Sequence, residues 1–190
     1  MSKKYEVRTT AERYIHNELS TCAWHFQGVA KKKIETGETE GCALDMMAAL
    51  VFCAFSTEAK VNFVGWKTLQ DGWPERANLR EKIDLLRKTL SLHIDWSTRP
   101  LQTVAKLKRF RDTLAHGKPE IVDETQVTDV EPEIWDALKA QWENSVQPDF
   151  VDRCREDEEA LWDIMLKAAG IGRHETLTIG GQSLTVMSTK

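Results

Sequence analysis

Apolar side chains return every three or four positions along most of this chain, and breaks rich in glycine or proline separate the runs. This spacing predicts a long first helix over residues 6–34. A second helix is expected over residues 43–69, apolar on most sides in its first half and therefore central in the fold. Four further helices are expected after it, at residues 75–94, 101–116, 132–142 and 148–169.

The C-terminal tail has a different pattern. Residues 176–186 alternate between apolar and polar around Gly180 and Gly181, which predicts a small β-hairpin. Such a hairpin is only marginally stable unless it packs on something. We therefore expect an all-α fold, an up-and-down helical bundle, with a single helical domain over residues 1–170 and a tail over 171–190 that carries the hairpin.

The cysteines and the apolar runs indicate the environment. The four cysteines stand far apart without a CxxC pair, and the first residues do not resemble a signal peptide, so a reducing, cytoplasmic setting is expected. The longest apolar run, residues 46–55, has about half the length that a membrane-spanning helix needs, so no membrane span is expected. No zinc-ligand spacing and no Gly-rich phosphate loop occur, so we expect no metal site and no cofactor.

Charge is distributed unevenly in this chain, whose net charge is −4. Residues 104–118 carry five lysines and arginines against Asp112 alone, whereas residues 119–163 carry fifteen acids against three basic residues. The basic stretch either holds an anion or is a solvated helix face. The acidic stretch either covers the basic one or is solvated, and we interpret Glu158 and Glu159 as part of a solvated face.

One segment combines a permanent cation, a carboxylate and an imidazole within six residues at a predicted helix end. Arg111 can bind a phosphate through two hydrogen bonds, and His116 can transfer protons near neutral pH. Asp112 lies four positions before His116, so these two side chains share a helix face and can hydrogen-bond. Arg111 and His116 are about 140° apart around a helix. They converge only if Gly117 unwinds the last turn or if a second copy faces the first.

The sequence Arg111-Asp-Thr-Leu-Ala-His116 resembles the Arg–four-to-six–His motif of the HEPN superfamily, including the polar residue that often follows the arginine. Upstream, Phe55-Ser-Thr-Glu-Ala-Lys-Val-Asn62 is similar to the earlier HEPN helix, which carries a Ser/Glu/Asn pattern. The order of the two segments and their separation of roughly fifty residues agree with the superfamily. The resemblance covers about residues 43–119 and leaves the N-terminal helix and the acidic C-terminal third outside it.

The resemblance implies a helical bundle of HEPN type, here with additional C-terminal helices, that forms a homodimer in which the two motifs face each other. Many members of the superfamily are metal-independent endoribonucleases, often toxins or phage-defence effectors. The activity implied for this chain is cleavage of single-stranded RNA, in which the RNA 2′-hydroxyl attacks its own phosphate. An antitoxin or a regulatory protein would be a further partner.

The same resemblance implies a role for each residue of the motif. His116 would act as general acid and base, Arg111 would stabilise the charge of the transition state, and Asp112 would orient His116. Supporting polar side chains near the site would be Glu58 and Asn62. The side chains implied in binding the RNA backbone are Lys106, Lys108, Arg109 and Lys118.

A second interpretation is a non-catalytic HEPN-like module that binds a nucleotide or a protein partner, which the acidic balance of the chain favours. In this interpretation His116 only stabilises the C-terminal end of its helix through the helix dipole. Arg111 then pairs with Asp112 or with an acid of the C-terminal third. Glu58 and Asn62 then form a polar pair that supports the bundle.

Overall fold

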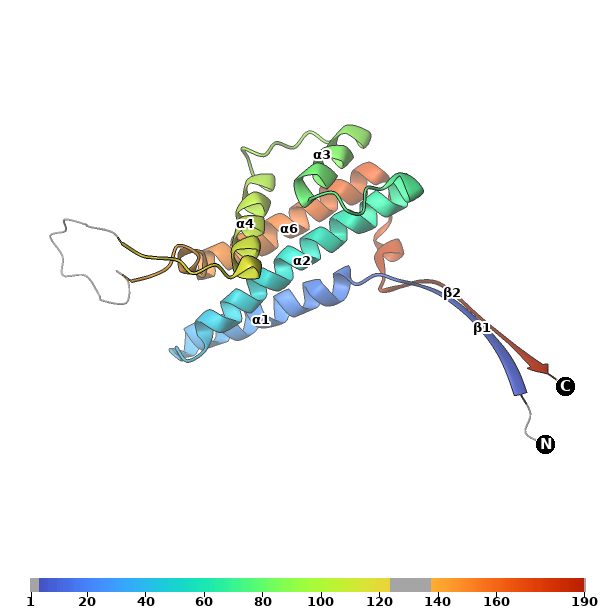
Figure 1. Cartoon of the computed structure of the whole chain (residues 1–190), viewed down its shortest axis with the longest axis horizontal. Helices are drawn as coiled ribbons and strands as arrows, with labels where there is room; N and C mark the ends of the chain where they lie inside the picture. Colours follow the sequence, from blue (N-terminus) through green and yellow to red (C-terminus); the bar gives the residue numbers. More distant parts are fainter. Residues whose placement is uncertain (1–3, 124–137, 190) are drawn as a thin grey trace.

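The computed structural model describes residues 4–123 and 138–189, which form a mostly helical protein with one small sheet (Figure 1). The helices are α1 (His16–Thr36), α2 (Cys42–Leu69), α3 (Leu79–Thr89), α4 (Leu101–His116) and α6 (Pro148–Ala169). Short 3₁₀ turns are η1 (Gln70–Gly72), η2 (Glu143–Ser145) and η3 (Arg173–Thr176). The strands are β1 (Lys4–Arg13) and β2 (Ile179–Thr189), which pair antiparallel. The mostly helical fold class is therefore confirmed.

Helix α2 is the central element of the bundle. It contacts α1, α3, α4 and α6, and Figure 1 shows it between α1 on one side and α3 with α4 on the other. The stretch Cys42–Gly72 is long and apolar enough to cross a membrane, longer than the run 46–55 had suggested. This is weak evidence for a membrane span, because the core helix of a soluble protein passes the same test. In this structure α2 packs against α1, α3, α4 and α6, and 39% of its apolar window is buried.

Two apolar clusters fill the bundle, one along each half of α2. The first includes Ala23, Leu50, Cys53, Phe110 and Cys154. The second includes Val64, Ile83, Leu101, Leu161 and Met165. Each of these side chains is at most 4% exposed. Because every helix contributes to one of the clusters, burial of apolar surface holds α4 and α6 against α2.

The helix ends follow local sequence signals. The expected end of α4 is confirmed at Gly117, whose φ of 53° is left-handed, a conformation that glycine adopts without steric cost. Helix α6 has Pro148 in its first turn and ends at Gly170 in the same conformation. Helix α3 is shorter than predicted, because Asn78 and Glu81 form a capping box that sets its first residue.

The predicted first helix is wrong over its N-terminal residues, since residues 4–13 form β1 and α1 begins at His16. Strand β1 pairs with β2 from the opposite end of the chain, so that Val7 lies opposite Val186 and Thr9 opposite Leu184. The pairing gives each segment backbone hydrogen bonds along one edge. A local pattern of apolar residues does not reveal a partner so distant in sequence.

The C-terminal tail forms the expected strand but does not fold back on itself. Gly180 and Gly181 lie within β2 rather than in a turn, and the pairing partner is β1. The two strands make a ribbon that extends away from the helices, with the start of β1 and the end of β2 at its tip (Figure 1). Five of its large apolar side chains are more than half exposed, namely Tyr5, Val7, Leu184, Val186 and Met187.

The segment leading into α6 is only partly within the described residues. The helix predicted over residues 132–142 lies mostly outside them, and its described end, residues 138–142, is turn and irregular backbone. Trp142 in this segment is half-buried and packs against the first apolar cluster, so it ties the segment to the bundle.

Candidate functional site

Helix α4 carries the motif, and its apolar face fixes its orientation in the bundle. Leu107 and Phe110 are buried in the first cluster and Val104 in the second. The polar residues of the helix occupy the remaining faces. Packing of three apolar side chains therefore determines which of the motif residues share a surface.

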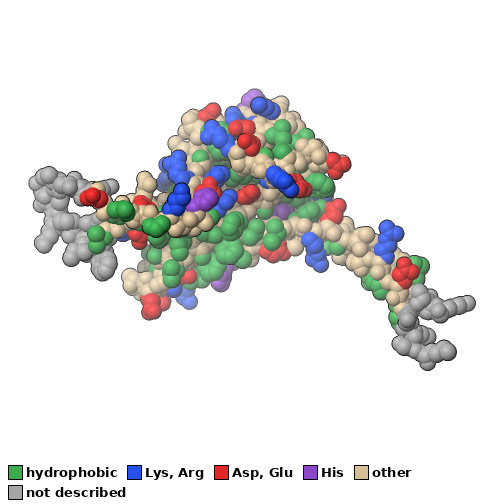
Figure 2. All heavy atoms as spheres, in the orientation of Figure 1, with side chains coloured by type: hydrophobic (Ala, Val, Ile, Leu, Met, Phe, Trp, Pro, Cys, Tyr) green, Lys and Arg blue, Asp and Glu red, His purple; other side chains and the backbone are tan. Residues whose placement is uncertain are grey.

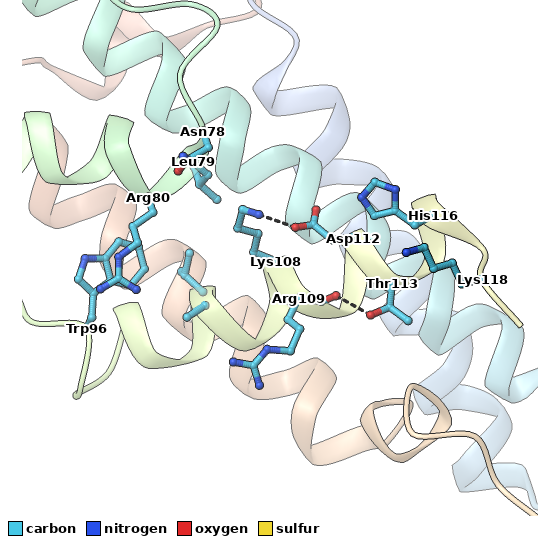
Figure 3. A pocket seen from close by; sticks show the side chains of 12 residues that line it. Asn78, Leu79, Arg80, Trp96, Lys108, Arg109, Asp112, Thr113, His116 and Lys118 are labelled. Carbon is cyan, nitrogen blue, oxygen red and sulfur yellow. Dashed lines mark hydrogen bonds and ion pairs between the residues drawn. The ribbon is translucent and has the colours of Figure 1, made fainter. Parts of the chain in front are cut away.

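A groove of about 770 Å³ runs along the solvent-facing side of α4 (Figure 3). Its other walls are the N-terminal end of α3, with Arg80, and Trp96 in the connection before α4. Asp112 and His116 of the motif line it, and among its described lining residues Asp112 is the only acid. It also contains three of the four cations that the sequence analysis assigned to RNA binding, Lys108, Arg109 and Lys118.

Asp112 and His116 share this groove but are not hydrogen-bonded to each other in the described part of the chain. Asp112 instead accepts a hydrogen bond from Lys108, one turn earlier on α4, and its Oδ1 lies 3.1 Å from a terminal nitrogen of Arg111. His116 is exposed at the end of the helix. The shared face predicted by the i, i+4 spacing is present, whereas the predicted hydrogen bond is not.

Arg111 does not line the groove and contacts α2 instead. Its terminal nitrogen donates to Oε2 of Glu58 at 3.0 Å, and its guanidinium lies 5.9 Å from the centre of the Phe55 ring. The side chain is 25% exposed, and its Nε is buried without a hydrogen-bond partner among the residues described. The fold thus brings Glu58 to the motif but leaves Arg111 and His116 on different surfaces, as their separation around the helix predicted.

Asn62 lies one turn after Glu58 on α2 but does not reach the motif. Its Oδ1 accepts a hydrogen bond of 3.3 Å from Nε1 of Trp73, so it secures the segment that follows α2. The Trp73 indole lies flat against Gly65, where an added Cβ would be only 2.4 Å from the ring atoms. This part of α2 therefore holds Trp73 and the segment after α2 in place. The predicted polar pair of Glu58 with Asn62 is not found.

Lys106 does not line the groove along α4, although Arg109 lines both that groove and the hollow that contains Lys106. Lys106 lines a separate hollow of about 410 Å³ between α4 and the segment that leads into α6. Glu120 and Asp149, both from the acidic third of the sequence, line the same hollow together with Arg153. Part of the acidic stretch therefore lies beside the flank of α4 from which Arg109 borders the groove.

An exposed apolar stripe runs along the outward face of α2 beside the motif. Leu44, Phe55 and Trp66 are 64%, 41% and 46% exposed, and partly buried Val51 lies between them at helical spacing. Figure 2 shows hydrophobic side chains gathered over α1 and α2 on the face in view. Because Phe55 also contacts Arg111, this stripe reaches the motif.

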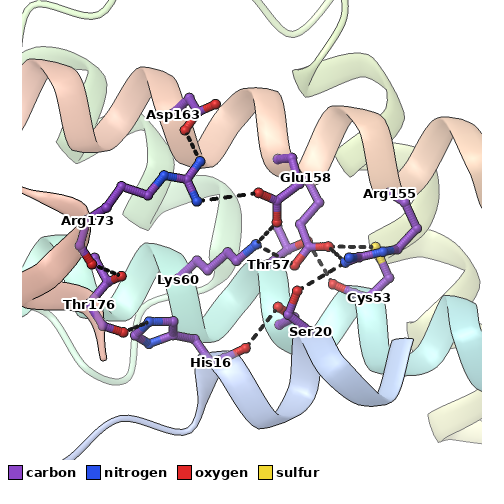
Figure 4. A network of polar contacts seen from close by, with 12 residues as sticks. His16, Ser20, Cys53, Thr57, Lys60, Arg155, Glu158, Asp163, Arg173 and Thr176 are labelled. Carbon is purple, nitrogen blue, oxygen red and sulfur yellow. Dashed lines mark hydrogen bonds and ion pairs between the residues drawn. The ribbon is translucent and has the colours of Figure 1, made fainter. Parts of the chain in front are cut away.

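A buried polar network that the sequence analysis missed joins α1, α2 and α6 (Figure 4). Nζ of Lys60 lies 3.1 Å from Oε1 of Glu158 and also contacts Glu159. Arg155 contacts the other oxygen of Glu158 and donates to Ser20 at 3.2 Å. The side chains of Lys60 and Glu158 are 4% and 1% exposed, so this is an ion pair in the interior of the bundle.

The interpretation of Glu158 as part of a solvated face is wrong. Glu158 lies one turn from buried Cys154 and one turn from buried Trp162, a spacing that places it on the inward face of α6. This spacing can be read from the sequence, but the neighbouring acids Glu156, Asp157 and Glu159 make the segment resemble a solvated charged face. Cys53 donates to Glu158 at 3.5 Å, and burial raises the pKa of this thiol well above its ordinary value, so it is not a nucleophile at neutral pH.

His16 connects the network to the base of the ribbon. Its Nε2 lies 3.0 Å from the carbonyl oxygen of Thr176, to which the side chain of Asn17 also donates. The imidazole is 1% exposed, and burial lowers its pKa below the ordinary value despite the hydrogen bond to Thr176. His16 is therefore held neutral, as a structural residue rather than a proton-transfer group.

Neither a metal-ligand cluster nor a similarity to known proteins assigns this chain to a family. Within residues 4–123 and 138–189 no three His, Cys, Asp or Glu side chains are grouped so that they could hold a metal ion. No match to this chain is found among family models, curated proteins or solved structures.

Proposed function

We propose that this protein is a metal-independent endoribonuclease of HEPN type that cleaves single-stranded RNA in the cytoplasm and acts as a homodimer. The observation that supports this best is the groove along α4. There an exposed imidazole, His116, lies with one carboxylate among lysines and arginines that suit the phosphates of RNA. A role as a toxin or phage-defence effector, with an antitoxin or a regulatory protein as partner, is the biological setting that the motif resemblance suggests.

In the proposed reaction the RNA supplies its own nucleophile. The 2′-oxygen forms a bond to the adjacent phosphorus, and the bond from phosphorus to the 5′-oxygen breaks. His116 accepts the proton of the 2′-hydroxyl and, as the imidazolium that results, donates a proton to the leaving 5′-oxygen. The products are a 2′,3′-cyclic phosphate and a 5′-hydroxyl. Lys108, Arg109 and Lys118 hold the neighbouring phosphates, since they line the groove that ends at His116.

A second copy of the chain completes the proposed site. Arg111 and His116 lie on different surfaces of one protomer, so the arginine beside a given His116 comes from the partner subunit. The apolar stripe on α2 is a surface for this association, because it reaches Arg111 through Phe55. For the partner's Arg111 to lie beside His116, the two-fold interface extends from this stripe over the end of α4 as far as His116.

The alternative function, a non-catalytic module that binds a nucleotide or a protein, is favoured by one observation. Arg111 already has two acidic partners in the protomer, Glu58 and Asp112. An arginine engaged in this way can serve only to hold α4 against α2. The apolar stripe would then bind a partner protein without contributing to a reaction.

The two functions are separated by incubating the purified protein with labelled single-stranded RNA, and with DNA of the same sequence, in EDTA. We expect cleavage of the RNA alone, with a 2′,3′-cyclic phosphate end. His116→Ala should slow cleavage by about 100- to 10,000-fold, the typical effect of removing a general acid or base. Lys32→Ala, an exposed change on α1, is the matched control and should cleave normally.

Asp112→Asn distinguishes orientation from proton transfer at the same site. Asp112 touches Lys108 and Arg111 rather than His116, so its loss should reduce cleavage less than the loss of His116. An equal or greater loss in a folded Asp112→Asn protein would reverse the two roles. Cleavage that needs a divalent metal, equal cleavage of DNA, or full activity of His116→Ala would each refute the mechanism.

A further inference from the structure

The end of the groove opposite His116 contains a flat platform that neither the motif nor its resemblance includes. The guanidinium of Arg80 lies 4.8 Å from the centre of the Trp96 ring. Figure 3 shows these two side chains together at one end of the groove, with Lys108 in the middle and His116 and Lys118 at the other end. The groove therefore has a stacking surface at one end and the candidate catalytic imidazole at the other.

The platform, formed by Arg80 and Trp96, is held in place by Asp84 of α3. Nε1 of Trp96 donates to Oδ1 of Asp84 at 2.8 Å, and Arg87 contacts the same oxygen at 2.9 Å. Although burial alone would raise the pKa of Asp84, the hydrogen bonds from Trp96 and Arg87 outweigh it and lower that pKa, so the carboxylate stays ionised. The Arg80 side chain is 63% exposed, which leaves it accessible to a ligand from solvent.

The length and charge of the groove fit a short single strand. Its lining residues on α4 extend from Val104 to His116, about 18 Å at 1.5 Å per residue. At about 3.4 Å per stacked nucleotide this corresponds to about five nucleotides. Asp112, the acid in the groove, is paired with Lys108 and Arg111, so it does not repel a phosphate strongly.

We propose that Arg80, supported by Trp96, binds a nucleobase of single-stranded RNA whose phosphates follow Lys108, Arg109 and Lys118 toward His116. The choice of RNA rests on the function proposed above, whereas the stacking platform rests on the geometry of Arg80 and Trp96. Arginine planes and aromatic rings are the surfaces on which proteins stack unpaired bases. The platform would place one base at a set distance from the phosphate that is cleaved.

The test is equilibrium binding, measured by fluorescence anisotropy, of a labelled six-nucleotide oligoadenylate to His116→Ala protein in EDTA. In that background Arg80→Ala should weaken binding about tenfold, within the range for loss of one stacked base. Arg80→Lys keeps the charge but lacks the plane, so it should weaken binding nearly as much. Lys32→Ala, which removes one charge on α1 away from the groove, should change affinity less than about twofold.

Two further measurements define the ligand. Affinity should increase with oligonucleotide length up to about five nucleotides and then change little, as the groove length requires. Lys118→Ala should reduce the slope of log affinity against log salt by about 0.7, the value for one phosphate contact of a single strand. DNA of the same sequence should bind with similar affinity, because the base and the phosphates contacted here are common to both nucleic acids; only cleavage distinguishes RNA from DNA.

The result for this platform is separable from the result for catalysis. If the wild-type protein cleaves RNA and the Arg80→Ala variant cleaves it with the same KM, the platform is refuted and the endoribonuclease proposal is not affected. Wild-type protein that binds RNA in an Arg80-dependent way without cleaving it would refute the endoribonuclease proposal alone. Absence of RNA binding, or binding that Arg80→Lys fully preserves, would also refute the platform.

Discussion

Replacing Lys60 by methionine tests whether the buried ion pair holds the bundle together. The change keeps the length and apolar stem of the side chain but removes the charge that faces Glu158 at 3.1 Å. Glu158 is 1% exposed and would retain Arg155 and Cys53 as its partners. Removing one member of a buried pair costs about 3–5 kcal/mol, because it leaves a charge in the interior. We expect a loss of about 3 kcal/mol, since Arg155 still compensates part of it.

The assays are urea unfolding and thermal unfolding, each followed by circular dichroism and tryptophan fluorescence. At this chain length a loss of about 3 kcal/mol lowers the melting temperature by about 6–12 °C. The matched control is Lys31→Met, which removes an ion pair of 2.9 Å with Asp152 between α1 and α6. Its side chains are 51% and 40% exposed, so its loss should cost less than about 1 kcal/mol.

The double variant Lys60→Met with Glu158→Gln distinguishes the ion pair from simple packing. Removing both charges avoids an unpaired carboxylate, and the amide oxygen of glutamine can still accept from Arg155. The double variant should therefore be more stable than the sum of the single losses predicts, by about 1–3 kcal/mol. Additive losses, or a loss below about 1 kcal/mol for Lys60→Met alone, would refute the reasoning.

Three further predictions follow from other parts of the fold. Gly65→Ala forces a methyl group into the Trp73 indole and should destabilise the protein by about 1–3 kcal/mol in urea unfolding, whereas Gly28→Ala, with nothing within 4 Å, should stabilise it by up to about 1 kcal/mol. The pKa of His16 is lowered in the folded state, so its contribution to stability is present above about pH 6.5 and is lost as the pH falls through the lowered pKa. His16→Gln should flatten the dependence of the unfolding free energy on pH, measured by urea unfolding at several pH values. An unchanged pH profile in His16→Gln would contradict this prediction. Sedimentation at tens of micromolar should give a dimer that Leu44→Asp, on the apolar stripe, converts to a monomer; a monomeric wild type would count against the proposed shared site.

The helices and the motif could be predicted because their signals are local. Helix α4 was predicted over its observed length, since Pro100 precedes it and Gly117 follows it. The i, i+4 relation of Asp112 to His116 places both on one face of any helix, and the groove contains both. The divergence of Arg111 from His116 was equally predictable, because rotation per residue in a helix is constant.

The ribbon, the buried ion pair and the groove could not be derived in this way. Strand β1 depends on β2 at the other end of the chain, and Lys60 on a carboxylate of α6. The groove needs Arg80 of α3 and Trp96 of the next connection beside α4. The physical reason is that burial and pairing depend on which surfaces meet in space. Local periodicity therefore establishes a helix and its faces, whereas the packing of the whole chain selects the neighbour of each face.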